Sequence, residues 1–177
     1  MFLAAPLPAH AAGRVWDALE PVRARHQEVR WILPESLHLT LVFLGSTEPA
    51  SVPQIDYALR NVAAATQACG VTLGAAGGRI GRRHGGVAWL QVVDRRQLVT
   101  HLAQAFDERL SSLRHGQINP AHLTVARAAD EALLKDLRQS GPAAGVGWKV
   151  DRIALWRSHT GPRGAFYEEL AAATLGG

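Results

Sequence analysis

Two short segments of the chain carry the same order of residues that could do acid–base chemistry. Both read His-Leu-Thr-aliphatic, with His38 and Thr40 in the first and His122 and Thr124 in the second. In a β-strand, alternate side chains share a face, so each segment would direct one imidazole and one hydroxyl the same way. Imidazole exchanges protons near neutral pH, and hydroxyls can donate hydrogen bonds to anionic oxygens. Two such strands that face one another could therefore hold a phosphoryl group between a general acid and a general base.

Other catalytic arrangements have less support in the sequence. Two histidines are too few for a typical zinc site, and no carboxylate accompanies either one at ligand-like spacing. Cys69 is the only cysteine, which excludes an internal disulfide and a multi-cysteine metal site. No nucleophile-elbow motif indicates a Ser-His-Asp triad. The chemistry expected of the two motifs uses neither a metal nor a cofactor. The alternative interpretation is that both motif histidines are structural strand residues, hydrogen-bonded to the backbone.

Positive charge accompanies the motifs in two places. Arg127 lies three residues after Thr124, but in a regular strand it would point to the opposite face, so a bend or bulge is required to bring them together. The glycine-rich segment 77–86 contains a second basic group. Its members are Arg82, Arg83 and His84. The segment is interpreted either as a flexible loop over a phosphate-bearing substrate or as a solvated hairpin loop with incidental charge.

The hydrophobic pattern indicates the elements that must position these motifs. Short apolar or alternating runs predict strands, and apolar residues at helical spacing predict helices between them. The expected strands lie at residues 2–5, 37–44, 71–75, 87–93, 121–127, 149–157 and 165–170, and the helices begin near residues 9, 51, 95 and 130. Ser51 and Asp130 are expected to cap two of these helices, and Trp89 to enter the core. The order favours an α+β fold with two related halves, each contributing one His-x-Thr strand.

Length and composition favour one compact unit. At 177 residues, the chain is long for one small domain and short for two, so we expect a single, bilobed domain over residues 1–177. Arginine supplies 17 of the 19 basic residues behind the net charge of +4, which favours an anionic partner such as RNA, although a GC-rich genome would produce the same bias. No segment approaches the roughly 20 apolar residues of a membrane span, and the start lacks the basic region of a signal peptide. We therefore expect a cytoplasmic monomer without membrane contact.

The motifs resemble those of the two-histidine phosphoesterase superfamily and, within it, the RNA 2',3'-cyclic phosphodiesterases, also called 2'-5' RNA ligases. Residues 37–45 match that family's Leu-His-Leu-Thr-Leu-x-Phe-Leu-Gly signature, and residues 120–127 match its Pro-x-His-Leu-Thr-x-Ala-Arg signature. Residues 2–8 are similar to its first strand, so the resemblance covers essentially the whole chain. Val125 replaces a common leucine, and residues 77–86 match no strict motif.

The resemblance implies a bilobed α+β fold in which antiparallel sheets face a central cleft across a pseudo-twofold axis. It implies that His38 protonates the leaving 3' oxygen and that His122 takes the proton from the attacking water. Thr40, Thr124 and Arg127 would hold the phosphate. The implied reaction opens a terminal 2',3'-cyclic phosphate of RNA to a 2'-phosphomonoester without metal, and its reverse would join RNA ends through a 2'-5' bond.

Two alternatives stay open at this point. A related enzyme could act on small cyclic nucleotides or 2'-5' oligonucleotides instead of an RNA end. The chain could also be a non-catalytic RNA-binding module, which would bind RNA in a salt-dependent way without turnover. The basic segment 77–86 lacks the interleaved aromatic residues of a base-stacking platform, which disfavours the second alternative.

Overall fold

Strands and helices are interleaved along the chain, as the sequence predicts. The computed structural model describes all residues except 82–84, 114–117, 119, 162–163 and 177. Within that part, the α-helices and β-strands in chain order are β1 (Phe2–Pro6), α1 (Ala9–Arg23), β2 (Arg30–Trp31), β3 (His38–Phe43), α2 (Val52–Ala64), β4 (Cys69–Arg79), β5 (Gly86–Val93), α3 (Leu98–Arg109), β6 (His122–Ala129), α4 (Glu131–Ser140), β7 (Gly147–Val150), β8 (Arg152–Gly161) and β9 (Gly164–Thr174). Two short 3-10 helices, Pro34–Ser36 and Pro49–Ser51, precede β3 and α2.

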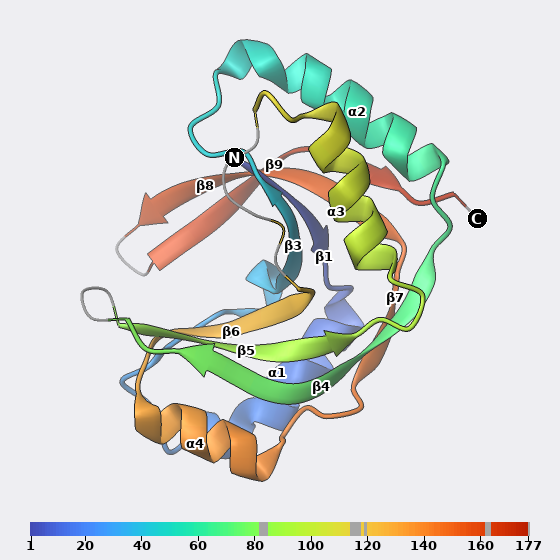
Figure 1. Ribbon diagram of the computed structural model, residues 1–177. Coiled ribbons are helices and arrows are strands. Elements are labelled where there is room, and N and C mark those ends of the chain that lie inside the picture. The colour runs from blue at the N-terminus through green and yellow to red at the C-terminus, as the bar shows by residue number, and fades with distance from the viewer. Residues whose placement is uncertain (82–84, 114–117, 119, 162–163, 177) are drawn as a thin grey trace.

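The strands of the described residues form one curled antiparallel sheet (Figure 1). Its order is β7-β4-β5-β6-β3-β1-β8-β9, and β2 pairs with β6 beside this path. The two halves, β7-β4-β5-β6 and β3-β1-β8-β9, meet where Leu39 of β3 pairs with Leu123 of β6. Each half therefore contributes one motif strand to the junction, and the predicted α+β fold with two related lobes is confirmed.

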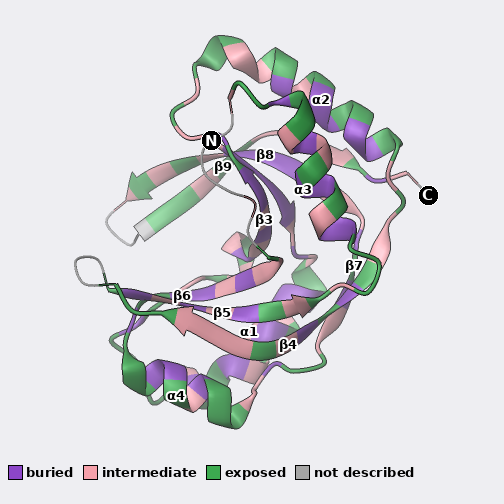
Figure 2. Ribbon diagram, viewed as in Figure 1, coloured by how far each residue is buried: buried purple, intermediate pink, exposed green. Residues whose placement is uncertain are grey.

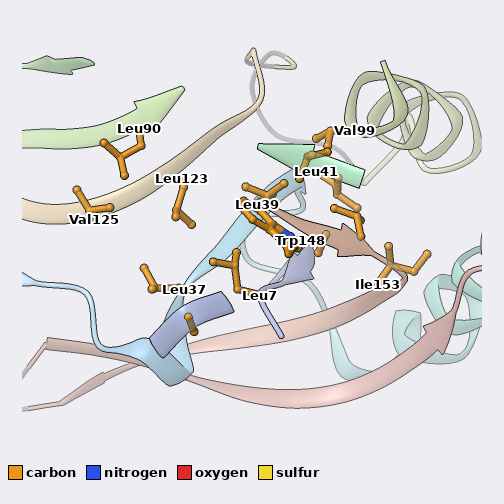
Figure 3. Packing of buried hydrophobic residues seen from close by; sticks show 14 of the residues in the cluster. Leu7, Leu37, Leu39, Leu41, Leu90, Val99, Leu123, Val125, Trp148 and Ile153 are labelled. Carbon is orange, nitrogen blue, oxygen red and sulfur yellow. The ribbon is translucent and has the colours of Figure 1, made fainter. Parts of the chain in front are cut away.

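Helices cover one face of each half of the sheet. Helix α4 packs on β4, whereas α2 packs on β8 and β9, and α3 packs on β3. Most buried side chains lie between helices and sheet, with Leu39 and Leu123 fully buried at the junction (Figure 3). Phe2 and Trp156 belong to a second, smaller buried cluster, and Figure 2 shows how burial is distributed over the elements. The opposite face of the sheet, the inner face, carries the remaining residues of the motif strands.

Local chemistry explains how α4 is bounded. The carboxylate of Asp130 accepts a hydrogen bond from the Leu133 amide at 2.8 Å, so the predicted N-cap is confirmed. Gly141 ends the helix with φ of +51°, a left-handed conformation that suits glycine. The predicted cap at Ser51 is wrong, because Ser51 itself has helical φ and ψ and its side chain makes no capping hydrogen bond.

Two of the predicted boundaries that differ from the structure concern how the strands pair. The expected strand 149–157 is two strands, because β7 pairs with β4 in one half whereas β8 pairs with β1 in the other. The expected loop 77–86 is partly strand, since β4 continues through Arg79 and β5 begins at Gly86. Tertiary pairing extends this hairpin although its glycines favour a loop.

No helix in the described part of the chain is both long and apolar enough to cross a membrane.

Candidate active site

The two motif histidines are held by the same local device. The Nδ1 atom of His38 lies 2.7 Å from the carbonyl oxygen of Ser36, and Nδ1 of His122 lies 2.8 Å from the carbonyl oxygen of Pro120. A carbonyl oxygen only accepts hydrogen bonds, so Nδ1 of each ring carries the proton and donates. This tautomer leaves Nε2 of each ring as the atom available for proton transfer.

The junction of the two halves brings the motifs together. Leu39 and Leu123 pair in antiparallel register and point into the core (Figure 3). Their neighbours therefore share the inner face, with each histidine beside the threonine of the other strand. Within the described residues, neither threonine hydroxyl makes a hydrogen bond, and both remain partly exposed. The inner face thus presents two imidazoles and two free hydroxyls at one place.

A one-residue shift in register follows each motif. In β3, Ala4 pairs with Thr40 but Leu3 pairs with Val42. In β6, Trp89 pairs with Thr124 but Ala88 pairs with Ala126. Each extra residue, Leu41 or Val125, changes the parity of its strand.

These shifts turn the fifth residue after each histidine back to the inner face. That residue is Phe43 in β3 and Arg127 in β6, and both are exposed. The irregularity required to bring Arg127 beside Thr124 is therefore present in the structure, and the same irregularity occurs in the first motif strand.

Aromatic rings surround His38. The centroid of its imidazole lies 5.1 Å from that of Phe2, 5.2 Å from that of Trp156 and 5.2 Å from that of Tyr167. Trp156 and Tyr167 stack on one another with a centroid distance of 5.3 Å. These residues come from β1, β8 and β9, so the part of the sheet beyond β3 encloses the first histidine.

His122 has a more open environment. Its ring lies 5.7 Å from that of Trp89, which comes from the neighbouring strand β5. The expectation that Trp89 enters the core is wrong, because its indole lies over Gly77 on the inner face and is only partly buried. A Cβ atom at Gly77 would fall 2.5 Å from Nε1 of that indole, so the glycine leaves the space that the ring occupies.

The surroundings of His38 disfavour its protonated form. Burial lowers the pKa of this imidazole from 6.5 to about 4, and electrostatic interactions with Arg127 and His122 act in the same direction. The hydrogen bond to Ser36 partly opposes the shift. Burial also raises the pKa of the Tyr167 hydroxyl, which Arg127 partly counteracts. Arg127 is therefore close enough to act electrostatically on both residues.

The structure brings together five of the eight residues that the sequence predicts for the site, and the other three are not among the residues that it describes. His38, Thr40, His122, Thr124 and Arg127 share the inner face. The expected RNA contacts Arg82, Arg83 and His84 lie outside the described residues. Among the residues that the structure does describe, no three His, Cys, Asp or Glu side chains gather where they could hold a metal ion.

Sequence reasoning missed the rings that enclose His38. Phe2 is distant in the chain from Trp156 and Tyr167, which lie on the consecutive strands β8 and β9, and the pairing of β1 with β3 and β8 brings all three to one histidine. Their signal in the sequence is weak, because aromatic residues on strands are usually part of the core.

Comparisons with known proteins agree with this geometry. The chain matches the model of the 2'-5' RNA ligase superfamily over residues 7–162. The crystal structure of TT0787 from Thermus thermophilus is similar, with a TM-score of 0.77, 22% identity, and coverage of 98% of this chain and 96% of that chain. Apo LigT from E. coli has a TM-score of 0.77, 23% identity, and coverage of 99% and 96%. LigT complexed with 3'-AMP has a TM-score of 0.74, 24% identity, and coverage of 98% and 95%. The comparison with curated proteins found no match.

At these identities, the solved structures establish the fold, and the family model establishes the relationship. The match spans both motif strands and most of the elements that position them. The resemblance inferred from the two His-x-Thr motifs is therefore confirmed, and this chain belongs to the 2'-5' RNA ligase superfamily of two-histidine phosphoesterases.

Proposed function

We propose that this protein is a metal-independent RNA 2',3'-cyclic phosphodiesterase, which hydrolyses a terminal 2',3'-cyclic phosphate to a 2'-phosphomonoester. The main observation in support is that both imidazoles have Nδ1 committed to a backbone carbonyl, so both Nε2 atoms are free on one face. A guanidinium accompanies them, together with two hydroxyls that make no hydrogen bond within the part of the chain that the structure describes. Proton transfer and anion binding are the two requirements of phosphodiester hydrolysis without a metal.

The proposed reaction needs one proton acceptor and one proton donor. His122 Nε2 takes a proton from water as the water oxygen forms a bond to phosphorus. The bond between phosphorus and the 3' oxygen breaks, and His38 Nε2–H donates its proton to that oxygen. The product carries a 2'-phosphate and a 3'-hydroxyl, and the two histidines return to their starting protonation states by exchange with solvent. With the 5'-hydroxyl of a second RNA in place of water, the same two proton transfers would join RNA ends through a 2'-5' bond, and the 3' oxygen would again be the leaving group.

The acid role of His38 depends on the bound substrate. In the free protein, a pKa of about 4 leaves this imidazole neutral at pH 7. A phosphate anion beside the ring would favour its protonated form, and it would also offset the repulsion from Arg127. We therefore infer that the acid forms only in the complex, with Thr40, Thr124 and Arg127 holding the non-bridging oxygens.

The nature of the ligand has indirect support from the comparisons. LigT, which shares this fold, has been crystallised with 3'-AMP, so a related protein accommodates a nucleotide with a 3'-phosphate. Phe43 offers an exposed aromatic ring on the inner face, as a nucleobase would require for stacking. We also propose that the protein acts as a monomer in the cytoplasm, where RNA ends would be available.

The test is hydrolysis of an RNA ending in a 2',3'-cyclic phosphate, in excess EDTA, by the wild type and two variants. We expect wild-type turnover to a 2'-phosphate end, with losses of about 10²- to 10⁴-fold in His38→Ala and in His122→Ala. His101→Ala, which removes an exposed histidine of α3, serves as the matched control and should keep wild-type activity.

The same experiment separates the alternatives. Faster turnover of a cyclic mononucleotide than of the RNA end would favour the small-nucleotide enzyme. Salt-dependent RNA binding without turnover, unchanged in both histidine variants, would favour the non-catalytic module. Activity that survives both substitutions in folded protein would remove these histidines from the mechanism.

A further inference from the structure

Three arginines lie in one row across four strands of the sheet. Arg79 of β4 pairs with Val87 of β5, Val87 pairs with Arg127 of β6, and Arg127 pairs with Arg30 of β2. Residues that pair directly across strands point to the same face. Arg127 therefore has an arginine on each side, one strand away on one side and two strands away on the other. Neighbouring strands are about 4.8 Å apart, so the row extends over roughly 15 Å.

Packing identifies the face on which the row lies. Gly77, two residues before Arg79, lies under the Trp89 ring that contacts His122. Gly78 lies on the opposite face, because a Cβ atom there would collide with Leu134 of α4. Alternation along β4 then places Arg79 on the same face as Trp89. The row is thus part of the inner face that carries the motif histidines.

The short strand β2 indicates independently that the row of arginines lies on the inner face. Trp31 packs against the core, and its indole Nε1–H donates to the carbonyl oxygen of His26 at 3.0 Å. Arg30, the preceding residue, must point the other way and is exposed. The pairing of β2 with β6 therefore adds Arg30 to the inner face, next to the phosphate-binding candidate Arg127.

These arginines differ from many others on the surface in having no acidic partner. Within the described residues, Arg30, Arg79 and Arg127 form no ion pair and no side-chain hydrogen bond. Elsewhere in the described part of the chain, arginines pair with carboxylates, namely Arg23 with Glu20, Arg25 with Asp136, Arg60 with Asp56, Arg152 with Glu169 and Arg157 with Glu168. Like charges opposite one another destabilise a sheet, so the row holds unbalanced charge that an anionic ligand would neutralise.

The row has a defined position relative to the reacting groups. Along β6, the histidine comes first, then Thr124 and then the row at Arg127. A terminal phosphate held between the histidines would lie beside Arg127, and the rest of a longer substrate would have to cross the row to leave the site. Guanidinium groups suit phosphate oxygens because their planar fork donates two hydrogen bonds.

We propose that Arg30 and Arg79 bind internucleotide phosphates of a single-stranded RNA whose 3' end lies at the two histidines. The inference rests on the proposed function and deepens it, because these two arginines would make the protein prefer an RNA end over a cyclic mononucleotide. A mononucleotide has only the terminal phosphate and cannot reach them. Arg127 would serve both classes of substrate.

The kinetic test compares two substrates that share the same terminal nucleotide. One is a cytidine 2',3'-cyclic phosphate, and the other is a ten-residue RNA ending in the same group. We expect Arg30→Gln and Arg79→Gln to lower kcat/KM for the RNA about 5- to 10-fold, while the mononucleotide value stays within about twofold. Arg138→Gln makes the same charge change on the exposed side of α4, behind the sheet, and should affect neither substrate.

A binding measurement makes the inference independent of catalysis. Fluorescence anisotropy would give the affinity for the same RNA carrying a 2'-phosphate end at several salt concentrations. Log K for single strands falls with log salt, and each phosphate contact contributes about 0.7 to the steepness of this fall. Each variant in the row should therefore make the salt dependence shallower by about this amount. Arg138→Gln should keep the wild-type slope.

The outcomes separate this inference from the proposed catalysis. Slopes and RNA kinetics that match the wild type in both Arg30→Gln and Arg79→Gln would overturn the arginine row, even if the cyclic phosphates are hydrolysed. Equal losses for RNA and mononucleotide would overturn it too, since the arginines would then act on the terminal phosphate. Reduced slopes in a protein that hydrolyses neither substrate would support the row and overturn the proposed reaction.

Discussion

The two motif strands have the same local structure but different surroundings. Each histidine donates Nδ1–H to the carbonyl two residues earlier, and each strand shifts register at the third residue after the histidine. His38 is then enclosed by the rings of Phe2, Trp156 and Tyr167, whereas His122 contacts one ring. The fifth residue after the histidine is a phenylalanine in one strand and Arg127 in the other.

This difference shows how a repeated motif can acquire two chemical roles. The repeat determines tautomer and direction, because both depend on neighbouring backbone. The pKa depends on what the other strands place around the ring, and those strands are not repeated. Three experiments test whether the asymmetry has the consequences that the structure implies, beginning with the largest expected effect.

The aromatic surroundings should matter more for stability on the His38 side. Trp156 is only 6% exposed, so Trp156→Ala should lower the free energy of unfolding by about 3 to 5 kcal/mol. Trp89 is partly exposed, so Trp89→Ala should cost about 1 to 2 kcal/mol. Urea denaturation of the three proteins at pH 7 measures both values. Equal losses would show that the two histidines stand in equally well-packed environments.

The charge at the fifth position should matter for turnover more than the ring at the equivalent position. Arg127→Gln removes a guanidinium beside the phosphate site and should lower kcat/KM for a cyclic mononucleotide about 10²-fold. Phe43→Leu changes the matching residue of the other strand and should lower the same kcat/KM less than about 10-fold. Arg127→Lys keeps the positive charge but loses the two parallel N–H donors of the guanidinium, so its kcat/KM should lie between those of the wild type and Arg127→Gln. A larger loss in Phe43→Leu than in Arg127→Gln would reverse the comparison.

Removing one of the rings that enclose His38 should raise the pKa of its imidazole. In the folded protein the pKa is about 4, below the ordinary 6.5, so the unfolded chain takes up this proton first as the pH falls. The stability linked to this group is therefore complete above pH 6.5 and is lost between pH 6.5 and 4. Tyr167→Ala, which exposes one side of the ring, should shift the NMR titration midpoint of His38 toward 6.5.

The second tyrosine of the chain provides a control for this titration. Tyr57 is exposed on α2 and lies outside the group of rings around His38, so Tyr57→Ala should leave the midpoint at the wild-type value. A titration midpoint that does not move in Tyr167→Ala would mean that the remaining rings are sufficient to shield the His38 imidazole from solvent.

Some predictions from the sequence failed where pairing overrides local pattern. Trp89 has the size and strand setting of a core residue, but the face on which it lies is decided by the register of β5 against β4 and β6. The expected strand 149–157 divides because its two parts pair in different halves of the sheet. Neither register is encoded within the segment concerned, since each depends on strands distant in sequence.

The sequence by itself determined the catalytic candidates, the α+β class and the two related halves. Alternation within a strand is a local property, so His and Thr at alternate positions must share a face wherever the strand lies. The tertiary structure alone decided that His38 is enclosed, that Arg127 reaches the inner face, and that Arg30 and Arg79 flank it. These features depend on burial, register shifts and pairing between distant strands, which arise only when the sheet is assembled.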